Sequence, residues 1–138
     1  MKNIWNSIVV AILVASCAMA QEQPVKILFD VTSSDTKVQE AAVRHVDMMS
    51  KTYTDSEFEV VMYGGSSQMA LQGKSTVEDK VRELVARENV KFVMCEGTLR
   101  RKEIKKSELI PGVGTVPDGI LELVNKQQQG WGYIKEGG

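Results

Sequence analysis

Short apolar runs alternate along most of the chain with segments in which apolar residues recur every three or four positions. The apolar runs predict buried β-strands, which cover residues 25–31, 58–63, 90–95, 113–116 and 131–135. The recurring pattern predicts helices, which cover residues 36–51, 76–88, 98–106 and the stretch between Pro117 and Gln127. In the last helix we expect Ile120, Leu121, Leu123 and Val124 to be the buried positions.

Strands that alternate with helices predict an α/β fold. Such a chain forms a mainly parallel sheet of about five strands, with right-handed crossovers that place helices on both faces. Neither a linker nor an internal repeat interrupts the pattern, which predicts one domain over residues 21–138.

The first 20 residues are typical of an export signal. Lys2 is followed by an apolar run over residues 8–15, and residues 18–20 form an A-x-A cleavage site. The run is shorter than the roughly 20 residues that span a bilayer. Residues 14–17 also resemble a lipoprotein signal, in which Cys17 would be lipidated and would anchor the protein to a membrane. Both alternatives place the domain outside the cytoplasm, in the periplasm.

Loss of residues 1–20 from the 138-residue chain leaves 118 residues, which is enough for one domain. Because Lys2 is among those lost, 16 Lys and Arg residues remain against 18 Asp and Glu residues, and the net charge is −2. A nucleic-acid-binding domain would carry a basic surplus, so we expect no nucleic acid as partner.

Cys95 would be the only cysteine of the mature chain, and it ends a predicted strand. The carboxyl edge of a parallel sheet is where open α/β folds build their sites. A following helix and the basic residues Arg100, Arg101 and Lys102 would lower the pKa of the thiol and attract anions, while Glu96 opposes both effects. Alternatively, Cys95 is a small buried apolar residue and the basic stretch is a solvated helix face.

Asp30 and Ser33 follow the first predicted strand, so they reach the same edge and are candidate binding residues. Turn formation and helix capping explain them equally well. Cys95 and the only histidine, His45, cannot form a conventional zinc site, and no G-x-G-x-x-G follows the first strand. We therefore expect neither a metal nor a cofactor, and we interpret Tyr133 as a packing residue.

Three segments together resemble a known family. Residues 92–95, 109–113 and 129–134 are similar to those of the DsrE/DsrF-like family, which includes the TusD-type sulfur carriers and small YchN-like proteins. The resemblance implies a flavodoxin-like three-layer α/β/α sandwich over residues 25–135, assembled as a homotrimer or homohexamer. It also implies that Cys95 accepts a sulfane sulfur as a persulfide.

Two functions remain open at this point. The first is a periplasmic sulfur carrier, or sulfurtransferase-like protein, that uses Cys95 with small anionic sulfur species or with a sulfur-donor or sulfur-acceptor protein. The alternative is a non-catalytic oligomeric binding module in which Cys95 is structural. The accessibility of the Cys95 thiol to alkylation would distinguish them.

Overall fold

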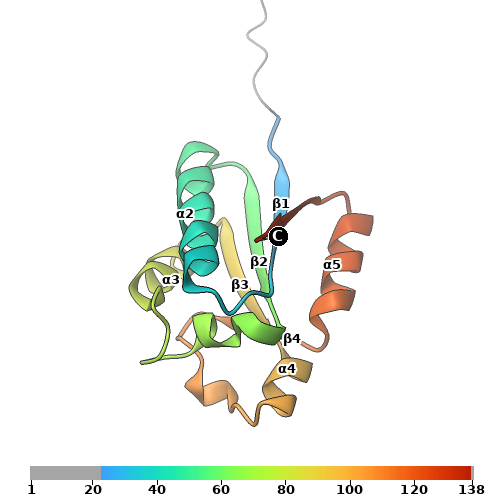
Figure 1. Ribbon diagram of the computed structural model, residues 1–138. Helices are drawn as coiled ribbons and strands as arrows, with labels where there is room; N and C mark the ends of the chain where they lie inside the picture. The colour runs from blue at the N-terminus through green and yellow to red at the C-terminus, as the bar shows by residue number, and fades with distance from the viewer. Residues whose placement is uncertain (1–22, 138) are drawn as a thin grey trace, which may run out of the picture.

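A five-stranded sheet forms the middle layer of the structure, a computed structural model that describes residues 23–137 (Figure 1). Its strands are β1 (Lys26–Val31), β2 (Glu57–Met62), β3 (Val90–Cys95), β4 (Gly114–Val116) and β5 (Gly132–Glu136). All neighbouring pairs are parallel, in the order β4-β3-β2-β1-β5. The predicted export signal, with Cys17, lies outside the described residues.

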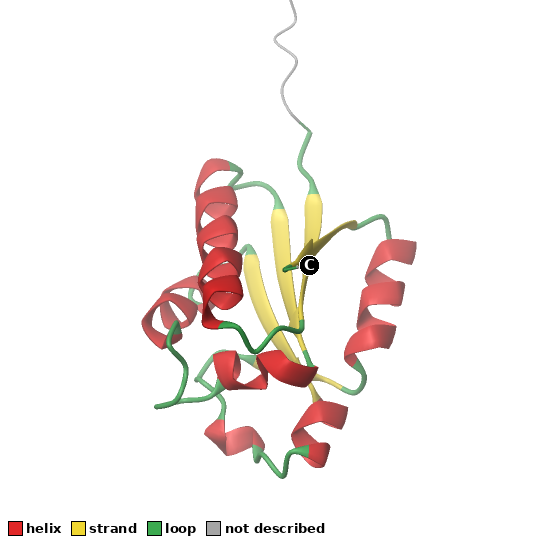
Figure 2. Ribbon diagram, viewed as in Figure 1, coloured by secondary structure: helices red, strands yellow, loops and turns green. Residues whose placement is uncertain are grey.

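Helices cover both faces of this sheet, which confirms the predicted three-layer α/β/α fold (Figure 2). The helices are α2 (Thr36–Thr52), α3 (Glu78–Val85), α4 (Glu96–Arg101) and α5 (Gly119–Gln128), with 3-10 turns η1 (Gly64–Ala70) and η2 (Lys106–Glu108). From β1 to β4 the chain always steps in one direction, so right-handed crossovers place α2 and α3 on one face. The step from β4 back to β5 runs the other way and places α5 on the opposite face. Within residues 23–137, no helix has the length and apolar character needed to cross a membrane.

The two faces of the sheet bury very different amounts of apolar surface. The α2 and α3 face holds the large core, which includes Phe29, Phe58 and Phe92. The α5 face holds a small cluster of Leu28, Val61, Leu123 and Trp131.

The prediction that four apolar residues of the last helix are buried is wrong for three of them. Only Leu123 is buried, whereas Ile120, Leu121 and Val124 are 61%, 55% and 43% exposed. The reason is that, among residues 23–137, α5 lies alone on its face of the sheet, with no second helix beside it to cover the rest of its apolar side (Figure 1).

The helix predicted over residues 98–106 begins earlier and is shorter. Helix α4 starts at Glu96, directly after β3, and ends at Arg101. Glu103 then takes a left-handed conformation with φ of 54°, which no α-helix continues through. The strand therefore turns into the helix without an intervening loop, and this brings the first turn of α4 against Cys95.

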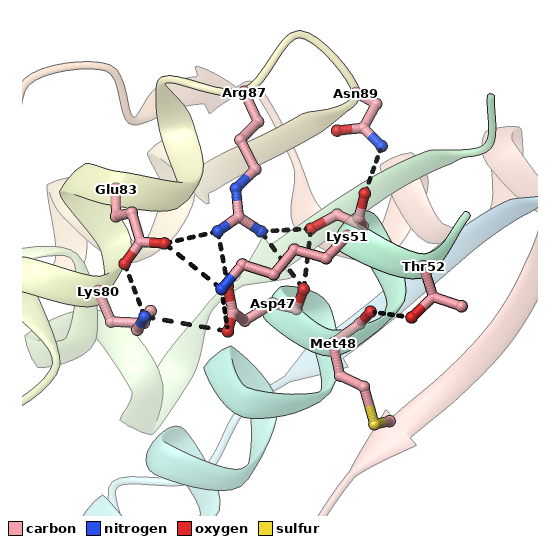
Figure 3. A network of polar contacts seen from close by, with 9 residues as sticks. Asp47, Met48, Lys51, Thr52, Lys80, Glu83, Arg87 and Asn89 are labelled. Atoms are coloured by element: carbon pink, nitrogen blue, oxygen red, sulfur yellow. Dashed lines mark hydrogen bonds and ion pairs between the residues drawn. The ribbon is translucent and has the colours of Figure 1, made fainter. Parts of the chain in front are cut away.

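Helices α2 and α3 are joined by a network of charged side chains centred on Arg87 (Figure 3). The Arg87 guanidinium donates to Asp47 Oδ1 at 2.6 Å, to Ser50 Oγ at 2.7 Å and to Glu83 Oε1 at 2.6 Å. Lys80 bonds Glu83 at 2.6 Å and so extends the network along α3. These contacts fasten the two helices that cover the large core.

Candidate functional site

Cys95 lies where the chain leaves two neighbouring strands in opposite directions. From β3 the chain enters α4, whose Leu99 belongs to the large core, whereas from the adjacent β4 it enters α5 on the other face. Such a switch point at the carboxyl edge is where open α/β sheets form crevices for ligands. The Cys95 residue is 9% exposed and belongs to the buried residues of the protein.

The pKa of the Cys95 thiol is lowered from its ordinary value by hydrogen-bond donors around the sulfur. Burial makes the largest single contribution and raises the pKa. Together, however, hydrogen bonds from the backbone amides of Gly119 and Thr98, the Thr98 hydroxyl and the Gly97 amide lower the pKa by more. Gly97 and Thr98 belong to the first turn of α4, and Gly119 is the first residue of α5. The thiolate is therefore stabilised by the amino ends of two helices.

Thr98 and α5 are themselves held in place by hydrogen bonds. Thr98 is buried, and its Oγ1 accepts from the Gly64 amide at 3.0 Å. The Asp118 carboxylate caps α5 by accepting from the amides of Ile120 at 2.9 Å and Leu121 at 3.1 Å. The amide donors of α4 and of α5 are thus both held in place near Cys95 by further hydrogen bonds.

The three basic residues predicted to bind anions have different partners. Arg100 is largely exposed and approaches Glu96 at 4.0 Å, whereas Arg101 donates to Thr98 Oγ1 at 3.4 Å. Lys102 donates to Ser67 Oγ at 2.8 Å. The donors that lower the Cys95 pKa most are amides and a hydroxyl, so the thiol does not depend on this basic stretch in the way the sequence suggested.

The backbone at Gly97 leaves room for a methyl group beside the sulfur. The point where a Cβ would lie on Gly97 is 3.4 Å from Cys95 Sγ and 3.9 Å from Arg100 Nη2. A glycine here leaves room beside the thiol, and the Arg100 guanidinium borders that room.

Tyr63 is the neighbour of Cys95 on the next strand. Met62 pairs with Met94 in the β2 and β3 register, so the next residues along these strands, Tyr63 and Cys95, stand side by side. The point where a Cβ would lie on Gly119 is 3.2 Å from both Cys95 Cβ and Tyr63 Cδ1. Only a glycine lets the start of α5 approach both side chains so closely.

Asp30 lies beyond Tyr63 and is almost fully buried. Its Oδ2 accepts from the Tyr133 hydroxyl at 2.6 Å and lies 3.2 Å from Lys135 Nζ, while its Oδ1 has no hydrogen-bond partner among residues 23–137. The hydrogen bond to Asp30 raises the pKa of Tyr133 to about 12. Tyr133, interpreted from the sequence as a packing residue, is 44% exposed and has this polar role instead.

Ser33 lies in the turn that leads into α2. Its hydroxyl accepts from the Asp35 amide at 3.1 Å, and its carbonyl accepts from Gln39 Nε2 at 3.0 Å. These contacts shape the turn that leads into the helix, and a binding role for Ser33 stays a prediction.

Sequence reasoning missed Tyr63, Thr98 and Gly119. Tyr63 carried a signal, because it ends the second apolar run just as Cys95 ends the third. No signal in the sequence marks Gly119, since its approach to Cys95 depends on β4 lying beside β3. Among the described residues, no group of three or more His, Cys, Asp or Glu side chains is arranged to hold a metal ion.

Comparison with known proteins identifies the family. A model of the DsrE/DsrF-like family matches residues 15–135. The structure is similar to that of the protein of unknown function MTH1491 from Methanobacterium thermoautotrophicum, with 25% identity and a TM-score of 0.75 over 80% of this chain and 98% of that one. The ychN protein from E. coli shares the fold at 14% identity, with a TM-score of 0.67 over 82% of this chain and 98% of its own. A search of curated proteins gives no match. Since the family model covers most of the sequence, the chain belongs to the DsrE/DsrF-like family.

Proposed function

We propose that the protein is an exported sulfur carrier in which Cys95 accepts a sulfane sulfur as a persulfide. Its family is related to sulfur relay. The observation that carries the proposal is the lowered pKa of a thiol at the switch point, since a thiolate is the form of cysteine that attacks sulfur. A cysteine that only packs in a core has no need of amide donors from two helices.

The proposed step is a sulfur–sulfur exchange that needs no oxidant or reductant. The Cys95 thiolate attacks the sulfane sulfur of thiosulfate, a bond forms between the two sulfur atoms, and the bond to the sulfonate breaks, so that sulfite leaves. A polysulfide reacts in the same way, with a shorter polysulfide as the leaving group. Cys95 then carries one additional sulfur atom as an anionic persulfide.

The surroundings of Cys95 support a small anionic donor. The space at Gly97 lies against the sulfur and is bordered by Arg100, which would face the negative end of the donor. Arg101 and Lys102 add positive charge to the same short segment, and this raises the local concentration of anions.

We also propose that the protein works as a homo-oligomer, either a trimer or a hexamer. The exposed apolar residues Ile120, Leu121 and Val124 support this, because single helices rarely leave such a row uncovered in a monomer. The same helix begins at Gly119, which lies beside Cys95, so a neighbouring subunit or a sulfur-accepting protein seated on this helix would lie close to the thiol. Export to the periplasm rests on residues 1–20 alone, and attachment to a membrane would require lipidation of Cys17.

The test is intact-mass spectrometry of the mature protein after incubation with thiosulfate or polysulfide, with Cys95→Ser as the control. We expect the wild type alone to gain one sulfur mass, and dithiothreitol to remove it. The absence of an adduct, together with a native thiol that resists alkylation but reacts after unfolding, would refute the carrier function. That result would support a binding module with a structural cysteine.

A further inference from the structure

The Tyr63 side chain lies between the Cys95 thiol and the buried Asp30 carboxylate. The pKa of Tyr63 is raised, and burial makes the largest contribution. It is raised further by the negative charge of Asp30, by hydrogen bonding to Asp30 and by the charge of Cys95. Lys135 Nζ, 3.2 Å from Asp30, also lies 6.0 Å from the centre of the Tyr63 ring. Tyr63 thus lies near Cys95 on one side and near the Asp30 and Lys135 pair on the other.

The hydroxyl of Tyr63 is not fixed by a regular hydrogen bond to Asp30. Asp30 accepts its short hydrogen bond from Tyr133, and within residues 23–137 its Oδ1 has no partner of standard geometry. Because the Asp30 side chain is only 4% exposed, this oxygen is buried. This oxygen can therefore accept one more hydrogen bond.

A persulfide on Cys95 would need a donor that the amides do not supply. The amides of Gly97, Thr98 and Gly119 surround Sγ, which is the leaving atom when sulfur is passed on. The outer sulfur lies about 2 Å beyond Sγ, at the length of a disulfide bond. It carries negative charge, and that charge repels an attacking thiolate or other anionic acceptor.

Tyr63 is placed to relieve this repulsion. Adjacent strands lie about 4.8 Å apart, and Tyr63 and Cys95 occupy matching positions on β2 and β3. The Tyr63 ring and the Cys95 side chain also meet at the same face of Gly119. A sulfur added to Sγ therefore extends into the neighbourhood of the Tyr63 side chain.

We propose that Tyr63 donates a hydrogen bond to the outer sulfur of the Cys95 persulfide, and that Asp30, on the other side of Tyr63, is a positioning residue for the Tyr63 side chain. This inference rests on the proposed carrier function. In the release step a nucleophile forms a bond to the outer sulfur, the sulfur–sulfur bond breaks, and its electron pair stays on Cys95 as thiolate. Tyr63 lowers the charge on the outer sulfur during the attack and keeps its own proton, so the step is balanced without a further reactant.

Cyanide tests the release step, because it attacks the outer sulfur of a persulfide and leaves as thiocyanate, which is measured by its ferric colour. Each variant is first loaded with polysulfide, and loading is checked by mass. We expect Tyr63→Phe to load within about twofold of the wild type and to release thiocyanate at least tenfold more slowly. Tyr53→Phe is the matched control, since Tyr53 is also half-buried but packs against the large core on the far face, and its rate should equal the wild type.

A second measurement needs no sulfur chemistry. Titration of tyrosines labelled at Cζ, followed by NMR, should show a lower Tyr63 pKa in Asp30→Asn and in Cys95→Ser, because each substitution removes a negative charge that raises it. A Tyr63→Phe variant that loads and releases sulfur like the wild type would overturn the role of Tyr63 and leave the carrier function standing. A wild type that never loads would overturn the carrier function, and an unchanged Tyr63 titration in Cys95→Ser would overturn the contact itself.

Discussion

Substitution of Gly119 by alanine tests whether the start of α5 activates Cys95. The added Cβ would lie 3.2 Å from Cys95 Cβ, 3.2 Å from Tyr63 Cδ1 and 3.4 Å from Tyr63 Cβ. These distances are shorter than those that most Cβ atoms make with their neighbours. The first turn of α5 must therefore move away by a few tenths of an ångström. The Gly119 amide moves with it and donates less well to the thiolate.

The size of the effect follows from the energy of that hydrogen bond. A hydrogen bond to a charged group contributes about 1.5–3 kcal/mol, and one pKa unit corresponds to about 1.4 kcal/mol. Complete loss of the Gly119 donor would therefore raise the thiol pKa by about one unit or more. Because the helix moves only partly, we expect a rise of about half a unit to one unit. Crowding typically costs about 1–3 kcal/mol, and alanine in a helix recovers up to about 1 kcal/mol, so the variant should remain folded.

The assay is the rate of iodoacetamide alkylation of Cys95 as a function of pH, with unfolding in urea measured in parallel. Gly114→Ala is the matched control, because a Cβ there meets Phe92 O and Val93 Cγ1 only at 3.8 Å, which is an ordinary contact. Its alkylation curve should coincide with that of the wild type. A folded Gly119→Ala protein with an unshifted curve would refute the assignment of the Gly119 amide as a donor to Cys95.

Three further substitutions test separate parts of the structure. Arg87→Ala removes the side chain that joins α2 to α3 and should lower the free energy of unfolding in urea by about 1–2 kcal/mol, with no change in the alkylation rate of Cys95. Lys126→Met leaves the buried Glu59 without its 2.7 Å partner and should lower the free energy of unfolding by about 3 kcal/mol. Glu59→Gln added to the same chain should restore most of this stability, and no recovery in the double variant would contradict the pairing. Gly97→Ala fills the space beside Sγ and should slow sulfur loading severalfold, while α4 gains up to about 1 kcal/mol; unimpaired loading would show that the donor enters elsewhere.

The strands could be predicted because buried parallel strands leave a plain apolar signal. Each of the five lies within one or two residues of its expected position. The burial of α5 could not be predicted, since Ile120, Leu121 and Leu123 look alike in sequence. Which of them faces the sheet depends on how many helices share that face, and this follows from the strand order.

The candidate nucleophile could be predicted, but its surroundings could not. Cys95 ends an apolar run, and that position alone places it at the carboxyl edge. The nearby basic residues offered the obvious reason for a reactive thiol, whereas the structure places amide donors from α4 and α5 around the sulfur. Gly119 is 24 residues further along the chain, and only the pairing of β3 with β4 brings it to Cys95.

The backbone amides around Cys95 and the exposed Arg100 side chain both provide positive potential at this site, but they act over different distances. Their roles therefore differ. Backbone amides act over a hydrogen-bond distance inside a buried site, where salt screens little, so the pKa of Cys95 should depend weakly on ionic strength. Arg100 is exposed and acts on ions in solution, where about 0.15 M salt limits its field to roughly 8 Å. The amides therefore set how much thiolate is present, and the arginine governs how often an anionic donor arrives. A site that relied on the basic residues for both roles would lose its thiolate and its substrate together as salt rises, whereas this arrangement keeps the thiolate under conditions that weaken capture.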